Sequence, residues 1–195
     1  HSLAVITTLL FLGIDIIDDL ADGDDRKFWE GYSRDEINLA AMLLLCSLPQ
    51  IFISRLDIPP KKKNILHQTL AESFLLMGSG QQFDLGFTKS LSVTVDEVEK
   101  SVIAKTGEEL ALFAALAAHY AGATKKQVKH YTEFARHLGT AIQFSTDCHD
   151  LFEAPYSRDL IHGTRTLPIV FHLERKKCEE REVFIRELAE AERNV

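Results

Sequence analysis

Closely spaced aspartates near the start of the chain are the residues whose types and spacing best suit chemistry. Asp15, Asp18, Asp19 and Asp22 recur at steps of three and four, which places them along one side of a helix. Like charges at these spacings destabilise a helix by about a few tenths of a kcal/mol per pair, and apolar surroundings add a desolvation cost. Bound Mg²⁺ would relieve the repulsion, because it prefers oxygen ligands and also binds substrate phosphates.

A second polar cluster occurs far along the chain. Gln143, Asp147 and Asp150 stand at i, i+4 and i+7 and therefore share a helix face. Taken alone, this cluster equally fits a solvated helix edge, and an ordinary acidic turn is the alternative for the first cluster. Taken together, the two clusters indicate opposite walls of a site that binds metal and diphosphate.

Cationic side chains stand where such a site needs them. Arg26 and Lys27 follow the first cluster closely, and Lys105 immediately precedes an interruption at Thr106 and Gly107. A lysine at such an interruption can reach inward as a point charge for phosphate. Plain solvation is the alternative for each lysine, and the basic run 61–63 indicates only a solvated loop.

The elements that must position these residues are predicted to be helices throughout. Apolar residues recur at three- and four-residue steps along most of the chain, and the one segment with period-two alternation, 90–95, is too short to indicate a strand. Ser33 and Thr94 begin capping-box patterns, and Thr124 is a candidate helix cap. We expect a helix end near Pro49, and a helix that is perturbed or ended at 78–80, because proline and glycine interrupt helices.

Composition limits the class of protein. The 195 residues carry 22 basic and 29 acidic side chains, a formal charge of −7, which argues against a general nucleic-acid binder. Cys46, Cys148 and Cys178 form no CxxC pair, so we expect a reduced, cytoplasmic setting. The most apolar stretch, 3–17, is shorter than the ~20 residues of a membrane span, and it lacks the basic leader and cleavage site of a signal peptide.

These motifs together resemble the trans-isoprenyl diphosphate synthase family, also called polyprenyl synthetases. The resemblance covers nearly the whole chain and consists of seven segments in the family's order. The first three are the DDxxD motif at 18–22, a basic pair at 26–27, and the Trp-Glu-Gly and Ile-Asn-Leu-Ala sequences at 29–31 and 37–40, counted together. The other four are GQxxDL at 80–85, KT at 105–107, the second Asp-rich helix at 134–152, and a GKxTLP-like segment at 163–168.

The resemblance implies an all-α isoprenoid synthase fold, with antiparallel helices around a central active-site cavity. We expect 1–195 to form a single domain of this kind. Because the chain begins with His1 and lacks the family's basic segment for isopentenyl diphosphate, we expect N-terminal helices to be missing. The segment after Asp150 is shorter than in the family, so a loop there is a second candidate omission.

The resemblance also implies the chemistry. Isopentenyl diphosphate would condense with an allylic prenyl diphosphate to give a longer trans-prenyl diphosphate, with three Mg²⁺ ions bound to the diphosphate. The implied metal ligands are Asp18, Asp19, Asp22, Asp147 and Asp150; the implied substrate-binding residues are Arg26, Lys27, Lys105, Gln82 and Arg165; and Lys105, Thr106 and Gln143 would act at the reacting groups. Asp84 would support the site. A homodimer is expected as the functional unit.

In the family, the positions four and five residues before the first motif line the tunnel for the growing chain. They correspond to Ile14 and Gly13. A glycine inside a helix costs about 1 kcal/mol relative to alanine, so Gly13 indicates either room for the product or close packing of helices. Both interpretations stay open at this point.

Two departures from the family pattern leave other functions open. Thr146 replaces the first aspartate of the second motif, and Thr164 stands where the family has lysine, with Arg165 beside it. A class I terpene cyclase or a peptide-modifying prenyltransferase of the same fold would tolerate loss of the isopentenyl diphosphate site. A non-catalytic subunit of a heteromeric synthase would tolerate the weakened second motif, but the intact first motif argues against it.

Overall fold

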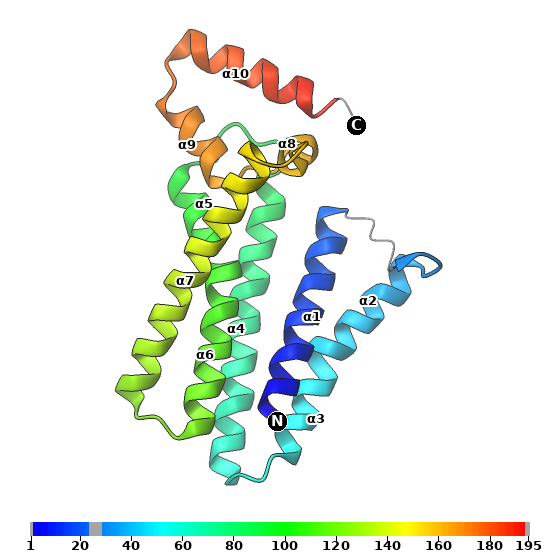
Figure 1. The fold of residues 1–195 in the computed structure, drawn as a ribbon, viewed down its shortest axis with the longest axis vertical. Helices are drawn as coiled ribbons and strands as arrows, with labels where there is room; N and C mark the ends of the chain where they lie inside the picture. Colours follow the sequence, from blue (N-terminus) through cyan, green and yellow to red (C-terminus); the bar gives the residue numbers. More distant parts are fainter. Residues whose placement is uncertain (1, 24–28, 194–195) are drawn as a thin grey trace. The chain divides into compact units, whose positions relative to one another are not determined.

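Helices form every regular element in the part of the chain that the structure describes. The computed structural model describes residues 2–23 and 29–193 (Figure 1), and it confirms the predicted all-α class. The elements in chain order are α1 (Ser2–Asp22), α2 (Arg34–Met42), η2 (Leu43–Ser47), α3 (Leu48–Arg55), α4 (Pro60–Phe87), α5 (Val95–Val102), η3 (Ile103–Gly107), α6 (Glu108–Ala121), α7 (Lys125–Phe152), α8 (Arg158–His162), α9 (Leu167–Arg175) and α10 (Cys178–Ala191). The elements η2 and η3 are single π-helical turns that join neighbouring α-helices.

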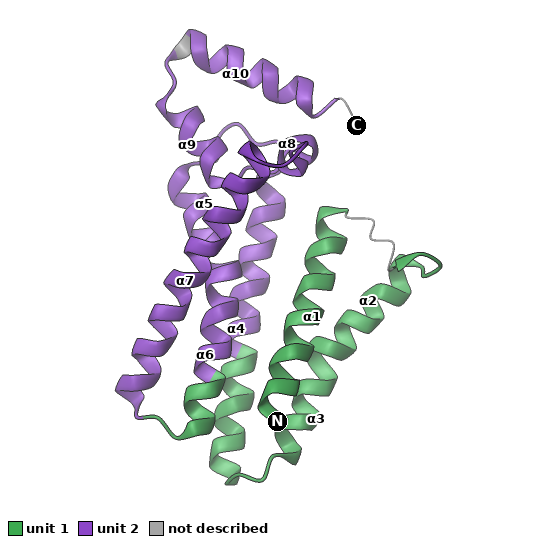
Figure 2. Cartoon of the chain, in the orientation of Figure 1, with its two compact units in different colours: residues 1–71, 116–123 green, residues 72–115, 124–195 purple. Residues whose placement is uncertain are grey.

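The chain forms two compact units, which Figure 2 shows in different colours. Unit 1 consists of residues 1–71 and 116–123, and unit 2 consists of 72–115 and 124–195. Two helices, α4 and α6, therefore contribute to both units.

Unit 1 has its core between α1 and the helices that follow it. Ile16 of α1 packs with Ile37 and Ala41 of α2, and Trp29 packs against this group. The predicted capping box at the start of α2 is confirmed, because Glu36 N–H donates to the Ser33 hydroxyl and Ser33 N–H donates to the Glu36 carboxylate. These bonds satisfy backbone donors that the first helical turn cannot pair internally.

Glycine inside α1 permits a close contact within unit 1. A Cβ added to Gly13 would lie 2.7 Å from Leu45 Cδ2 in η2. This contact supports the packing interpretation of Gly13. Ile14, the neighbouring residue, is half-buried, and a role of either residue in chain length stays a prediction.

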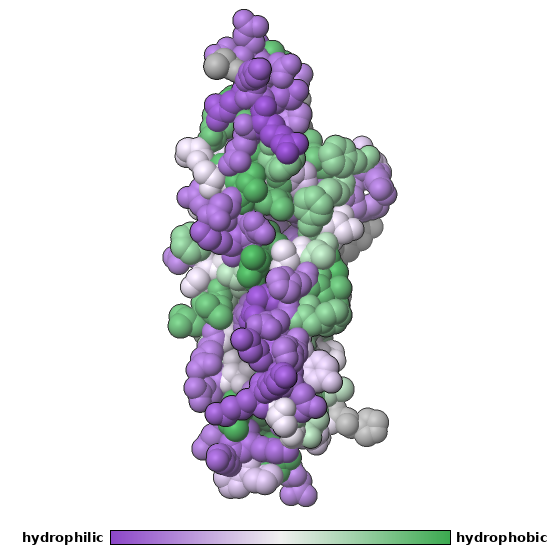
Figure 3. Space-filling model, turned by 90° about the vertical axis from the view of Figure 1, so that its left-hand side faces the viewer, coloured by the Kyte–Doolittle hydropathy of each residue, from purple (hydrophilic) through white to green (hydrophobic). Residues whose placement is uncertain are grey.

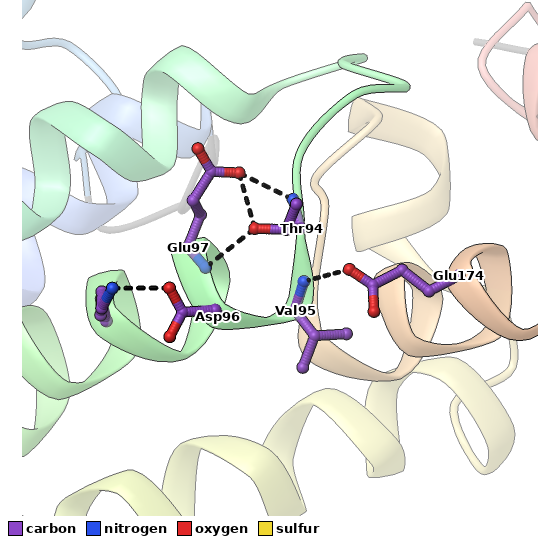
Figure 4. Close-up of polar contacts among 6 residues, drawn as sticks. Thr94, Val95, Asp96, Glu97 and Glu174 are labelled. Carbon is purple, nitrogen blue, oxygen red and sulfur yellow. Dashed lines mark hydrogen bonds and ion pairs between the residues drawn. The ribbon is translucent and has the colours of Figure 1, made fainter.

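In unit 2, the start of α5 is held both by its own capping box and by a distant carboxylate (Figure 4). Glu97 N–H donates to the Thr94 hydroxyl, and Thr94 N–H donates back to Glu97. Val95 N–H donates to the Glu174 carboxylate of α9 at 2.8 Å. Val98 and Val170 of the same two helices pack together, so polar and apolar contacts both fix α5 against α9.

Several predicted helix boundaries are wrong. The helix α4 does not end at Gly78 or Gly80 but continues to Phe87, because a glycine inside a helix costs only about 1 kcal/mol. Pro49 does not end its helix either, since it lies in the first turn of α3, where its missing N–H is not needed. The segment 90–94, whose period-two alternation was too short to indicate a strand, is an irregular connection, and Val95 begins α5.

One continuous helical stretch within the described residues, Arg34–Arg55, is long and apolar enough to cross a membrane by length and composition. Its most apolar window has a mean hydropathy of 1.8 and is 22% buried. Core helices of water-soluble proteins and N-terminal signal sequences meet the same criterion, so the stretch is weak evidence for a span.

Gly80 and Gly78 provide a matched test of packing on α4. A Cβ at Gly80 would lie 2.7 Å from Lys105 N, whereas a Cβ at Gly78 would have nothing within 4 Å. We expect Gly80→Ala to destabilise the fold by about 1–3 kcal/mol through overpacking. Gly78→Ala should instead stabilise it by about 0.5–1 kcal/mol, because alanine favours the helix. Urea unfolding measures both, and equal stabilisation by the two substitutions would contradict the close approach of α4 to η3.

Candidate functional site

A π-helical turn, η3, presents the two central residues of the candidate site. Where the sequence predicted a break at Thr106 and Gly107, the chain stays helical but widens into this turn. Such turns frequently occur at functional sites. A Cβ added to Gly139 of α7 would lie 2.5 Å from the Thr106 carbonyl oxygen, and one at Gly107 would lie 2.9 Å from Thr140 Oγ1. The absence of side chains at both glycines therefore lets η3 lie directly against α7.

Lys105 is held by a carboxylate from α4. Lys105 Nζ lies 3.2 Å from Asp84 Oδ2, and the two side chains are 22% and 27% exposed. Ser101 Oγ also donates to the Gly80 carbonyl at 2.8 Å and joins the same two segments. The ammonium group is thus kept at the edge of the interior, where solvent screening is weaker than at an open surface.

Thr106, Gln143 and Asp147 form a directional chain of hydrogen bonds. Thr106 Oγ1 donates to Gln143 Oε1 at 2.7 Å, and Gln143 Nε2 donates to Asp147 Oδ1 at 2.8 Å. The predicted spacing of Gln143 and Asp147 thus brings them together on α7, beside the turn that carries Thr106. The amide of Gln143 fixes the orientation of both neighbours, since its oxygen accepts while its nitrogen donates.

Asp147 is only 4% exposed. Burial raises the pKa of its carboxyl above the usual value and the charge of Asp84 raises it further, while the hydrogen bond from Gln143 lowers it in part. Folding raises the pKa of Asp147, so the neutral carboxyl contributes fully to the stability of the fold at pH values below its pKa in the unfolded chain. This contribution is lost as the pH rises through its pKa in the folded protein. A cation bound nearby would favour the ionised carboxylate and oppose this effect.

Asp150 makes contacts that the sequence did not predict. Its carboxylate accepts from Ser157 Oγ at 2.5 Å and from the backbone N–H groups of Arg158 and Asp159, both at 3.3 Å. These donors belong to the start of α8, where negative charge is favourable. A role of Asp150 as a metal ligand stays a prediction.

Arg165 lies inside unit 2 and is 3% exposed. Its Nε donates to the Ser90 carbonyl at 2.7 Å, its Nη1 to the Gly163 carbonyl at 3.1 Å, and its Nη2 to Glu192 Oε1 at 2.9 Å. The guanidinium therefore joins three segments of unit 2. The resemblance implied a substrate-binding role for Arg165, which stays a prediction, and no local pattern could have related Arg165 to Glu192, which is 27 residues away.

The first aspartate cluster lies on α1 in unit 1. Asp19 is buried, Asp15 and Asp18 are half-buried, and Asp22 is exposed. A contact that sequence reasoning missed holds the end of this helix, where Arg34 Nη2 donates to the Leu20 carbonyl at 2.6 Å. Gln82 is exposed on α4, whereas Arg26 and Lys27 lie outside the described residues.

Among residues 2–23 and 29–193, no three Asp, Glu, His or Cys side chains converge as a metal-binding group. Mg²⁺ does not require such a cage, because it is usually held by one or two carboxylates together with waters and substrate phosphates. The carboxylates on α1 and on α7 have the oxygen donors that suit this ion. The donor chemistry therefore fits Mg²⁺ in the company of a diphosphate.

Comparisons with known proteins converge on one family. The family model described as "Polyprenyl synthetase" matches residues 1–195. A short chain isoprenyl diphosphate synthase of Methanothermobacter thermautotrophicus is 27% identical over 122 residues, which is 60% of this chain and 38% of that protein.

Solved structures show the same fold. Geranylgeranyl pyrophosphate synthetase from Pyrococcus horikoshii is 23% identical with a TM-score of 0.86, over 97% of this chain and 62% of that one. A decaprenyl diphosphate synthase from Rhodobacter capsulatus is 16% identical with a TM-score of 0.84, over 98% and 63% of the two chains. The present chain thus spans less than two thirds of the length of these relatives.

The contacts of Arg165 predict a structural role. Arg165→Ala should destabilise the fold by about 3 kcal/mol, because it leaves the largely buried Glu192 without its partner. Arg165→Lys should restore only part of this loss, because an ammonium group cannot reproduce a guanidinium fork that reaches three oxygens. Urea unfolding measures the loss, and a stability equal to that of the wild type would show that these contacts are dispensable.

Proposed function

The chain belongs to the polyprenyl synthetase family, and from this premise we propose that it condenses isopentenyl diphosphate with an allylic prenyl diphosphate in a Mg²⁺-dependent reaction. The observation that carries the proposal is the group formed by Asp84, Lys105, Thr106, Gln143 and Asp147. It joins a positioned cation, an oriented amide and a buried carboxylate, which suits the binding of a leaving diphosphate.

In the proposed reaction, a new carbon–carbon bond joins the double bond of isopentenyl diphosphate to the allylic carbon. The bond between that carbon and its diphosphate breaks, and pyrophosphate leaves with the electron pair. A proton is then lost from the condensed product to the departing pyrophosphate. The protein must therefore stabilise negative charge on the leaving group and keep water from the allylic carbon.

Each residue has a task in this scheme. Lys105, held by Asp84, binds the allylic diphosphate as a point charge. Thr106 and Gln143 lie near the reacting carbons and orient one another. The proposed Mg²⁺ ligands are Asp18, Asp19, Asp22, Asp147 and Asp150, and bound Mg²⁺ would neutralise charge on the diphosphate.

One assay tests the reaction. Purified full-length protein is incubated with Mg²⁺, labelled isopentenyl diphosphate and, in turn, dimethylallyl, geranyl or farnesyl diphosphate, and the products are sized. Incorporation of label into longer prenyl diphosphates is the expected result. Consumption of primer without incorporation would instead indicate a cyclase, and no turnover together with a tight complex with another synthase would indicate a non-catalytic subunit.

The two aspartate clusters should differ in importance. Asp18→Ala or Asp19→Ala should abolish turnover, while Asp147→Ala should be milder, because the second motif already has Thr146 in place of an aspartate. Thr146→Asp should lower the Mg²⁺ concentration needed for half-maximal rate, since it adds an anionic oxygen ligand. Asp96→Ala, which removes an exposed carboxylate from α5, is the control. If the Mg²⁺ dependence of Thr146→Asp equals that of the wild type, the hypothesis that Thr146 weakens metal binding by the second motif is wrong.

We also propose that the functional unit is a cytoplasmic homodimer. In unit 1, Leu39 and Met42 are each 59% exposed and Leu43 is 49% exposed, so α2 and η2 present neighbouring apolar side chains. Contiguous exposed apolar surface commonly marks a protein interface. Other apolar residues are also exposed, as the green regions on the face in Figure 3 show. A test that assigns the dimer interface to α2 and η2 therefore needs a matched control at another exposed apolar residue.

Sedimentation velocity provides that test. The wild type should sediment as a dimer at micromolar concentration, and the pair Leu39→Glu and Met42→Glu should shift it toward monomer, because charges would be buried at the interface. Phe134→Glu alters an exposed apolar residue of α7 and should leave the dimer intact. A wild type that is monomeric at this concentration would refute the homodimer.

A further inference from the structure

A charged group with no assigned role lies inside unit 2 and joins three of its helices. Glu108 of α6 is 5% exposed. Its Oε1 accepts from Ser73 Oγ of α4 at 2.6 Å, and its Oε2 accepts from Nη2 and Nε of Arg136 of α7, at 2.7 and 3.2 Å. We call these three residues the Glu108 group. Because hydrogen bonds are directional, the group fixes the start of α6 against both neighbouring helices.

The Glu108 group is continuous with the turn that carries Lys105 and Thr106. Glu108 directly follows η3, and its backbone N–H donates to the Lys105 carbonyl. Arg136 lies against the same turn, since a Cβ added to Gly107 would lie 3.2 Å from the Arg136 carbonyl oxygen and 3.3 Å from Arg136 Cγ. Both members of the ion pair therefore meet the end of η3.

The π-helical turn η3 is anchored on both sides. Hydrogen bonds of a π-helix run from residue i to i+5, so such a turn holds one extra residue and rotates every later side chain by about 100° relative to an uninterrupted α-helix. Before η3, Val98 of α5 packs with Val170 of α9. After η3, Glu108 is bonded to α4 and α7. If η3 became α-helical while α5 stayed in place, the Glu108 carboxylate would turn away from both partners.

Stability alone does not account for charges at the start of α6. An apolar pair of similar volume is often as stabilising as a buried ion pair, and the next turn of α6 already buries Ala111 and Leu112 completely. Apolar burial is non-directional, whereas the hydrogen bonds of Glu108 specify the rotation of the first turn of α6. The Glu108 group thus supplies a direction that apolar contacts do not.

Resting on the proposed function, we propose that Glu108 is a positioning residue for the candidate site. Together with Ser73 and Arg136 it keeps η3 in its π-helical form, which directs Lys105 and Thr106 toward the diphosphate that is to leave. Loss of the Glu108 group lets η3 relax toward an α-helical turn while the rest of α6 stays packed. Lys105 then turns out of place, and the diphosphate loses the point charge that binds it.

The test is a double-mutant cycle on ligand binding, which needs no turnover. The double variant Glu108→Leu with Arg136→Leu removes both charges, because removing one would leave the other without its partner. Calorimetry measures the affinity for inorganic pyrophosphate in the presence of Mg²⁺, once with Lys105 present and once in Lys105→Ala. A residue that acts through Lys105 has no effect once Lys105 is absent, whereas a purely structural residue affects both backgrounds equally.

Two controls separate the position of Lys105 from charge and from stability. Lys129→Gln with Glu133→Gln removes an exposed ion pair from α7. Leu188→Ala removes buried apolar volume from α10, which destabilises the fold by leaving a cavity. Urea unfolding establishes that each variant is folded and measures its stability.

We expect the double variant to lower pyrophosphate affinity by about tenfold with Lys105 present and by less than about twofold in Lys105→Ala, since coupled residues act non-additively. Both controls should bind as the wild type does. Arg136→Lys alone, which keeps the charge but not the two-nitrogen contact, should lose only part of the affinity. Wild-type affinity in the folded double variant, or an equal loss in both backgrounds, would overturn the inference.

Elongation of an allylic primer by the same proteins distinguishes this inference from the proposed function. If the double variant binds and elongates as the wild type does, the proposed function stands and the role of Glu108 is wrong. If the wild type binds pyrophosphate but does not elongate, the proposed function fails, and the binding cycle alone decides the role of Glu108. If the wild type binds no pyrophosphate, both are wrong. If the double variant does not fold, Arg136→Lys decides by the same criterion, because lysine keeps a charge beside Glu108.

Discussion

The close approach of η3 to its two neighbouring helices is the constraint on which the candidate site depends. Gly80 of α4 leaves room for the backbone at Lys105, and Gly139 of α7 leaves room for the carbonyl of Thr106. With helices in such contact, short polar side chains can meet directly: Lys105 reaches Asp84, and Thr106 reaches Gln143. A methyl group at either glycine would collide with backbone atoms, which can move only if a whole helix moves.

Charge inside unit 2 is consistently paired or hydrogen-bonded. The Asp147 carboxylate accepts a hydrogen bond from the Gln143 amide, and the Glu108 carboxylate accepts from Ser73 and pairs with Arg136. Arg165 forms an ion pair with Glu192. Buried charges without partners would cost several kcal/mol each.

Local signals in the sequence correctly predicted the helical class and several helix starts. The capping boxes at Ser33, Thr94 and Thr124 are all present, because such caps involve residues only three positions apart. Predictions failed where glycine or proline was interpreted as a terminator. Gly80 lies within a helix because the backbone of η3 needs the space, and Pro49 begins α3 after the turn η2.

The sequence by itself determined the family, the aspartate clusters and the polar face of α7, because periodicity and motif order are local properties of one chain. It could not determine the partners of Arg165, Asp150 or Glu108. Tertiary structure decided that Arg165 binds Glu192, that Asp150 caps α8, and that Glu108 joins Ser73 to Arg136. The physical reason is that these contacts join side chains on different elements, and their distances depend on helix packing, which no spacing along the chain encodes.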